Sequence, residues 1–257
     1  MKDELSFLRL MHLADSALPI GGMAHSFGLE TLVAEELLSV TCLSDFLRGY
    51  LEEAGVLEGA FCRAGFDAVD GVSGELRVDH WLDVNARLGA LKPARETRAG
   101  SASLGHRFML LALALENSAV FEIALNEARR AGVAVHHSPA VGLGARVFGL
   151  EADAAVLGYL HQSMAALISA CQRLLPLGQT AAAQILWDLK ANIGEAGRRS
   201  AETTWEDACS FLPVLDWGAM EHAALRTRLG LLTWQELGVA LPGRVRRFLE
   251  EKYGIVA

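Results

Sequence analysis

The stretch 157–175 reads LGYLHQSMAALISACQRLL, and it decides the fold class. Its apolar side chains recur at steps of three and four residues over more than four turns, the period of an α-helix with one buried face. Pro176 cannot continue such a helix, and Gly178 frees the chain to turn, so we predict that the helix ends before this pair. The stretch therefore predicts a long core helix.

Similar apolar stripes occur along most of the chain, at 5–14, 27–38, 43–61, 76–91, 104–115, 120–131, 181–193 and 219–229. The short β-branched stretch 133–136 has no partner with which to form a sheet. We predict an all-α protein whose single domain of about ten helices spans 1–230, with an additional C-terminal helical tail over 231–257.

Helix boundaries are suggested by capping residues and by glycine. Ser138 before Pro139 predicts an N-cap followed by proline at the first helical position, and Asn117-Ser118 and Ser44-Asp45 suggest helix starts by the same logic. The glycine-rich stretch 65–74 is expected to be a surface loop. The stretch 194–200 (GEAGRRS) is interpreted as another loop or a weak point between helices.

Composition excludes several classes of protein. The chain has 257 residues, of which 52% are hydrophobic and 21% charged, so it is not disordered. A formal net charge of −8 argues against a nucleic-acid partner. No apolar run approaches the ~20 residues of a membrane span, and the acidic start MKDE does not resemble a secretory signal. Four separated cysteines without a CxxC motif are expected to be buried free thiols, which favours the cytoplasm.

Motifs for catalysis or cofactor binding are weak. There is no P-loop, no HExxH and no GxSxG, so we expect no cofactor and no enzymatic activity. The adjacent His136 and His137 are the best metal candidates, although neighbouring side chains tend to point apart. A metal-dependent or hydrolytic helical enzyme that uses His25, His136 or His137 remains the alternative.

The most unusual local feature is the stretch 17–30, ALPIGGMAHSFGLE. Its proline and glycine pair require backbone conformations that glycine tolerates best. One interpretation is a tight turn between helices, with Ser26 as N-cap and Glu30 near the positive end of the next helix. The other is a loop whose small residues let a partner's backbone approach closely. Geometry leaves both open.

Four blocks, in order over 8–229, resemble the UreF family of urease accessory proteins. The first contains Ser16, Leu18, Pro19, Gly21, Gly22, Ser26, Gly28 and Glu30; the second His137, Pro139 and Gly142; the third Arg173, Pro176, Gly178 and Gln179; the fourth Met220, His222, Arg226 and Arg228. The resemblance implies that these residues are partner-binding or family-specific structural positions.

The resemblance also implies a function. Members of the family are all-α dimers that bind a second accessory protein, UreD (also called UreH). The pair recruits the nickel-carrying GTPase UreG, and the assembly loads the urease apoprotein with nickel. Two departures from the family pattern are Met23-Ala24-His25 in the first block and the long tail 231–257, which we expect to add a helix to a partner contact. A helical regulatory module that only shares the fold is a further alternative.

Overall fold

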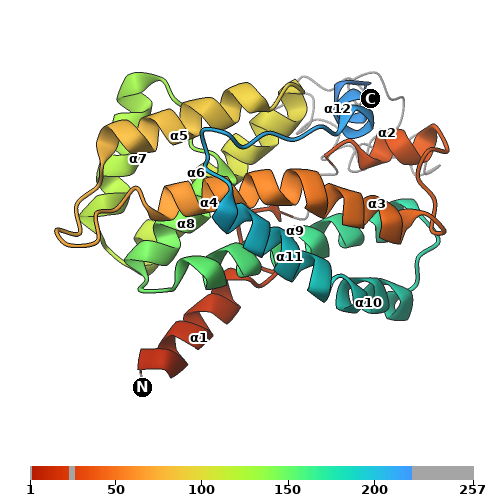
Figure 1. Cartoon of the computed structure of the whole chain (residues 1–257), viewed down its shortest axis with the longest axis horizontal. Helices are drawn as coiled ribbons and strands as arrows, with labels where there is room; N and C mark the ends of the chain where they lie inside the picture. Colours follow the sequence, from red (N-terminus) through yellow and green to blue (C-terminus); the bar gives the residue numbers. More distant parts are fainter. Residues whose placement is uncertain (1, 23–26, 222–257) are drawn as a thin grey trace, which may run out of the picture.

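The computed structural model describes residues 2–22 and 27–221. All regular secondary structure in these residues is helical, with only one isolated bridge between Val69 and Leu76, so the all-α prediction is confirmed. Figure 1 shows the arrangement of the helices. They are α1 Lys2–Leu13, α2 Leu29–Ala34, α3 Leu43–Tyr50, α4 Val56–Phe66, α5 Val78–Leu91, α6 Arg95–Leu115, α7 Ala119–Ala131, α8 His137–Val147, α9 Ala152–Leu174, α10 Gln179–Asp188, α11 Lys190–Glu202 and α12 Pro213–Glu221.

The centre of the fold is a rod made of α3, a π-helical segment Leu51–Gly55 and α4, which follow one another without a break. Almost every residue of α4 is buried, because α8, α9 and α11 all pack on it. The crossing of α4 and α8 depends on glycine. A Cβ atom at Gly142 would lie 1.8 Å from the Cys62 carbonyl oxygen, and one at Gly65 would lie 2.1 Å from that of Pro139.

The stretch that predicted a core helix forms most of α9, whose last residue, Leu174, precedes Pro176 as expected. Val156, Leu160 and Met164 are buried along one face of α9. By length and composition alone this helix could cross a membrane, but 56% of its most apolar window is buried inside the fold, as in a core helix. Its hydrophobicity is therefore explained by the packing around it.

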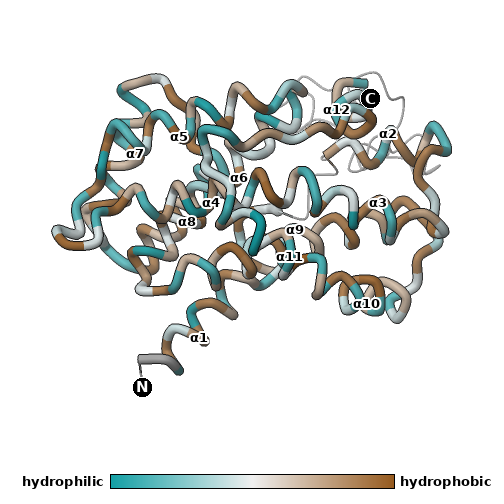
Figure 2. The backbone as a smooth tube through the Cα atoms, in the orientation of Figure 1, coloured by the Kyte–Doolittle hydropathy of each residue, from teal (hydrophilic) through white to brown (hydrophobic). Residues whose placement is uncertain are grey.

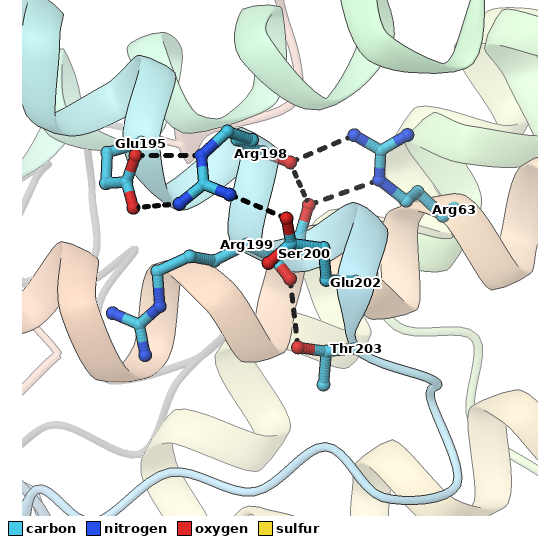
Figure 3. A network of polar contacts seen from close by, with 8 residues as sticks. Arg63, Glu195, Arg198, Arg199, Ser200, Glu202 and Thr203 are labelled. Carbon is cyan, nitrogen blue, oxygen red and sulfur yellow. Dashed lines mark hydrogen bonds and ion pairs between the residues drawn. The ribbon is translucent and has the colours of Figure 1, made fainter.

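Helix α11 corrects the interpretation of 194–200 as a loop or weak point, because it runs through that stretch without interruption. Its glycine is a packing residue: a Cβ at Gly197 would meet the Leu157 side chain at 2.9 Å. Figure 3 shows Arg63 of α4 donating to Ser200 Oγ at 3.2 Å and to the Gly197 carbonyl oxygen at 3.0 Å. Arg63 also pairs with Asp153 of α9 at 2.6 Å, so one guanidinium joins three helices.

The predicted helix starts have mixed outcomes. The Ser118 hydroxyl does cap α7 by accepting from the Val120 N–H. Ser44 does not cap α3, whose N-cap is Cys42. Ser138 is not an N-cap either, because α8 begins at His137, two residues before Pro139, and His136 occupies the cap position. The stretch 65–74 is largely a turn, as predicted, although α4 continues to Phe66.

Two of the four cysteines differ from the prediction of buried thiols. Cys62 and Cys171 are buried, but Cys42 is half-buried and Cys209 is exposed. Cys209 lies in the non-helical connection between α11 and α12, so no helix face buries it. The apolar stripe 219–229 begins inside α12, while the rest of it, the predicted domain boundary at 230 and the tail 231–257 lie outside the described residues.

Helix α1 extends from the main body at the lower left of Figure 1. Leu10 and Leu13 pack it against the core. In addition, Arg9 donates to the Phe148 carbonyl oxygen at 2.7 Å and Ser6 to that of Gly149 at 3.4 Å. Figure 2 shows apolar positions along α1 as along the other helices. Several of them, Leu5, Phe7, Leu8 and Met11, are exposed.

Candidate functional site

A cavity of about 110 Å³ lies where the connection between α1 and α2 meets α4, α6, α9 and α12. Its wall is largely apolar, with Ile20, Leu104 and Leu167 among the lining residues. Ser16, Leu18 and Gly22 from the first motif and His137 from the second also line it. The fold therefore brings parts of two predicted blocks, more than a hundred residues apart, to one place.

A buried ion pair lies at this cavity. Lys92, which follows α5, pairs through its Nζ with Oε1 of Glu58 on α4, and the two side chains are only 9% and 10% exposed. The other carboxylate oxygen, Oε2, accepts hydrogen bonds from Ser138 Oγ at 2.5 Å and from the Tyr159 hydroxyl at 3.2 Å. Buried charges require such compensation, because an unpaired one would carry a large desolvation penalty.

The network sets the protonation states of its members. Burial alone would raise the pKa of Glu58, but the Lys92 charge and the three hydrogen bonds outweigh it, so this pKa is lowered and the carboxylate stays ionised. Burial, assisted by the nearby Glu58 charge, raises the pKa of Tyr159 well above its usual value, so the phenol stays a proton donor. The cluster is thus a fixed pair of opposite charges.

The two candidate metal ligands, His136 and His137, have separate surroundings. The Nδ1 atom of His136 lies 3.2 Å from Ser101 Oγ, whereas the His137 ring packs edge-on against Tyr159, with 5.2 Å between ring centroids. Burial lowers both pKa values to about 4, so both rings are neutral at pH 7. The Nε2 atom of His137 is buried without a hydrogen-bond partner among the described residues. Within residues 2–22 and 27–221, no three His, Cys, Asp or Glu side chains lie close enough together to hold a metal ion.

The remaining residues of the second motif act in packing. Pro139 and Gly142 form the close contact of α8 with α4 described above, where any larger residue than glycine at 142 would collide with backbone. Ser138, expected to cap α8, contributes its hydroxyl to Glu58 instead. In this block the structure explains the small residues by helix contact, and it places only His137 on the cavity.

The first motif turns the chain and holds it against α12. Gly21 and Gly28 have positive φ angles of 78° and 93°. A Cβ at Gly28 would lie 2.8 Å from the Ala219 backbone nitrogen, so this glycine permits close contact with α12. Gly28, not Ser26, is the N-cap of α2, and Ser26 itself lies outside the described residues. Pro19 is exposed, and Glu30 is buried in the first turn of α2.

Among the described residues, the third-motif positions and Met220 of the fourth do not line the cavity. Arg173, Pro176, Gly178 and Gln179 are exposed around the turn from α9 to α10. Met220 is exposed near the end of α12, and His222, Arg226 and Arg228 lie outside the described residues. The described family motifs therefore mark two separate places, the cavity and the surface turn 173–179.

Several residues of the site were not predicted from the sequence: Glu58, Lys92, Tyr159 and Asp216. Lys92 is one of only four lysines in a chain rich in arginine, and Glu58 is the one acidic residue among the apolar and small residues of α4. Such isolated charges within apolar stripes are a usable signal for a buried ion pair. Their pairing across 34 positions is not visible in any local pattern.

Comparison with known proteins identifies the family. The UreF family model matches residues 39–190, more than half of the chain. The urease accessory protein UreF of Corynebacterium glutamicum (strain R) is 32% identical over 221 residues, which cover 86% of this chain and 95% of the relative. The proteins of the same description from Haemophilus influenzae (strain PittGG) and Paenarthrobacter aurescens (strain TC1) are 30% and 32% identical, over 86% of this chain and 93% and 96% of their own lengths. This chain therefore belongs to the UreF family of urease accessory proteins.

Proposed function

We propose that this chain is a cytoplasmic, non-enzymatic adaptor in urease maturation. It binds a UreD-type (UreH-type) accessory protein as a homodimer, and together they recruit the nickel-carrying GTPase UreG to the urease apoprotein. The observation that carries the proposal is the family match, because relatives named urease accessory proteins align with 86% of the chain. Nickel is the cargo of this assembly, and the chain needs no resident cofactor.

Exposed apolar side chains support a role in binding. On α1, Phe7 is 61% exposed, and Leu8 and Met11 are exposed on the same helix. Trp187 on α10 is 71% exposed and lies close in sequence to the exposed motif 173–179. Large exposed aromatic residues are enriched among those that dominate protein interfaces. We assign the α1 residues and the α9–α10 region as partner-binding surfaces, without assigning a partner to each.

The test is co-purification. The tagged chain is expressed with UreD and UreG, and the product is analysed by light scattering and metal content. A stable complex with both partners is expected. A chain that stays alone yet holds one metal ion per protomer would overturn the adaptor function and favour a metal-dependent enzyme.

Matched variants locate the surface. The double variant Phe7→Ser, Met11→Ser is expected to weaken partner capture or dimerisation at least tenfold, because both side chains are large, apolar and exposed on α1. The control is Val72→Ser, since Val72 is 99% exposed at the turn between α4 and α5, away from the family motifs. Equal binding by both variants would exclude α1 from the interface.

A further inference from the structure

The cavity carries an unbalanced charge. Among its described lining residues, three are charged, namely Glu58, Lys92 and Asp216, and the one imidazole, His137, is neutral. Glu58 and Lys92 neutralise each other in their ion pair. Asp216 on α12 forms no ion pair within 4 Å with any other described residue. The lining that the structure describes therefore carries one negative charge without an ion-pair partner.

Asp216 is placed unfavourably for a free carboxylate. It is half-buried between Leu215 and Trp217 on α12, at the cavity. Burial raises its pKa, and the positive charge of Lys92 opposes this only partly. A half-buried carboxylate of this kind is stabilised when a cation comes close to it. The same carboxylate would repel an anion from the cavity.

The rest of the wall fits an aliphatic chain that ends in a cation. Leu57, Leu91 and Leu212 offer apolar surface, and Phe27 and Tyr50 offer aromatic rings that can attract a cation through their faces. The volume of about 110 Å³ is somewhat smaller than the ~150 Å³ of a cavity that accommodates benzene. An unbranched alkyl chain matches this size better than a ring system does.

We propose that this cavity receives the ammonium or guanidinium end of a Lys or Arg side chain from a partner protein, with Asp216 as the counter-charge. The proposal rests on the adaptor function and adds the chemistry of one contact. Charge complementarity favours a basic side chain, because the described lining is net negative and the one cation in it, Lys92, is already paired. The apolar wall would cover the methylene groups of that side chain.

The first experiment uses the full chain and small probes. Calorimetry and NMR titrations compare n-butylamine, a cation at pH 7, with n-butanol, which has the same chain length and no charge. We expect n-butylamine to bind at least tenfold more tightly than n-butanol, and Asp216→Asn to remove this preference. The control variant is Asp207→Asn, because Asp207 is an exposed carboxylate in the connection before α12 and does not line the cavity. Equal binding of amine and alcohol would overturn the proposal.

The second experiment tests the source of the cation. Asp216→Asn is expected to weaken binding of the co-purified partners about tenfold, while Asp207→Asn leaves it unchanged. Amine binding together with an unaltered partner affinity would overturn the partner as source. A third outcome is that n-butylamine binds only after Arg226 and Arg228 are replaced by Gln. The chain would then supply the cation itself, and this outcome would also overturn the partner as its source. If the natural chain forms no complex at all, the adaptor function fails whatever the amine titration shows.

Discussion

Replacing Lys92 by Met tests the buried ion pair most directly. The methionine keeps the length and apolar stem of lysine but leaves the Glu58 carboxylate buried without its counter-charge. Breaking a buried pair by removing one partner costs about 3–5 kcal/mol. For a chain of this size that cost corresponds to a fall in melting temperature of roughly 10 °C. The free energy of unfolding is measured by urea denaturation followed by circular dichroism.

A double variant separates loss of the pair from loss of packing. Glu58→Gln combined with Lys92→Met leaves no buried charge, and the amide oxygen of glutamine can still accept from Ser138 and Tyr159. Neutral replacements of buried pairs are often close to neutral in stability, so the double variant should recover most of the loss. Lys190→Met, at an exposed lysine, is the control for the substitution itself.

The pH dependence supplies an independent check. In the natural chain the lowered pKa of Glu58 means that its contribution to stability is present above the unfolded value of about 4.3 and is lost as the pH falls through the folded value. In Lys92→Met only the Ser138 and Tyr159 hydrogen bonds still oppose burial, so the folded pKa of Glu58 rises relative to the natural chain. The penalty is therefore largest at pH 7 and shrinks toward pH 4. A loss below 1 kcal/mol at pH 7, or a double variant as unstable as the single one, would refute the reasoning.

Two further predictions follow from burial and close packing. Gly142→Ala should destabilise the fold by about 3 kcal/mol or more in urea denaturation, because the new Cβ would lie 1.8 Å from the backbone of α4. The control Gly194→Ala, with open space around it in α11, should stabilise the fold by up to ~1 kcal/mol. Equal effects of the two substitutions would contradict the close packing at Gly142. The imidazole NMR signals of His136 and His137 should not move between pH 7.5 and 5.5, because burial lowers both pKa values to about 4. In the unfolded chain these two imidazoles take up protons near pH 6.5, so they should make the free energy of unfolding fall as the pH drops from about 6.5 toward 4. An NMR titration midpoint near 6.5 would show instead that the rings are solvated.

Most of the fold could be predicted from the period of apolar residues. The stripe that forms α9 and its end before Pro176 were correct, since both depend on local sequence. The stretch 194–200 failed because glycine has two uses that look alike in sequence. In a loop it frees the backbone, whereas at Gly197 it lets α11 approach α9, and only the neighbouring helix decides between them.

The site was less accessible from sequence. Ser16, Leu18, Gly22 and His137 were predicted, and the fold does place them around one cavity. The Glu58–Lys92 pair was not, because its partners come from α4 and the end of α5 and meet only through tertiary packing. Ser138 shows the same limit: its local context indicates a cap, while a carboxylate 80 positions earlier determines its actual hydrogen bond.

The π-helical segment Leu51–Gly55 has a consequence for how this rod can change through insertion or deletion. A π-turn holds one residue more than an α-turn, and each α-helical residue advances the side chains by about 100°. The segment therefore sets the rotational phase of α4 relative to α3. Removing a single residue here would restore an unbroken α-helix and turn Leu47 and Glu58 out of register with each other. Length in this short segment is thus as constrained as residue identity, although of its residues only the uncharged Ala54 lines the cavity.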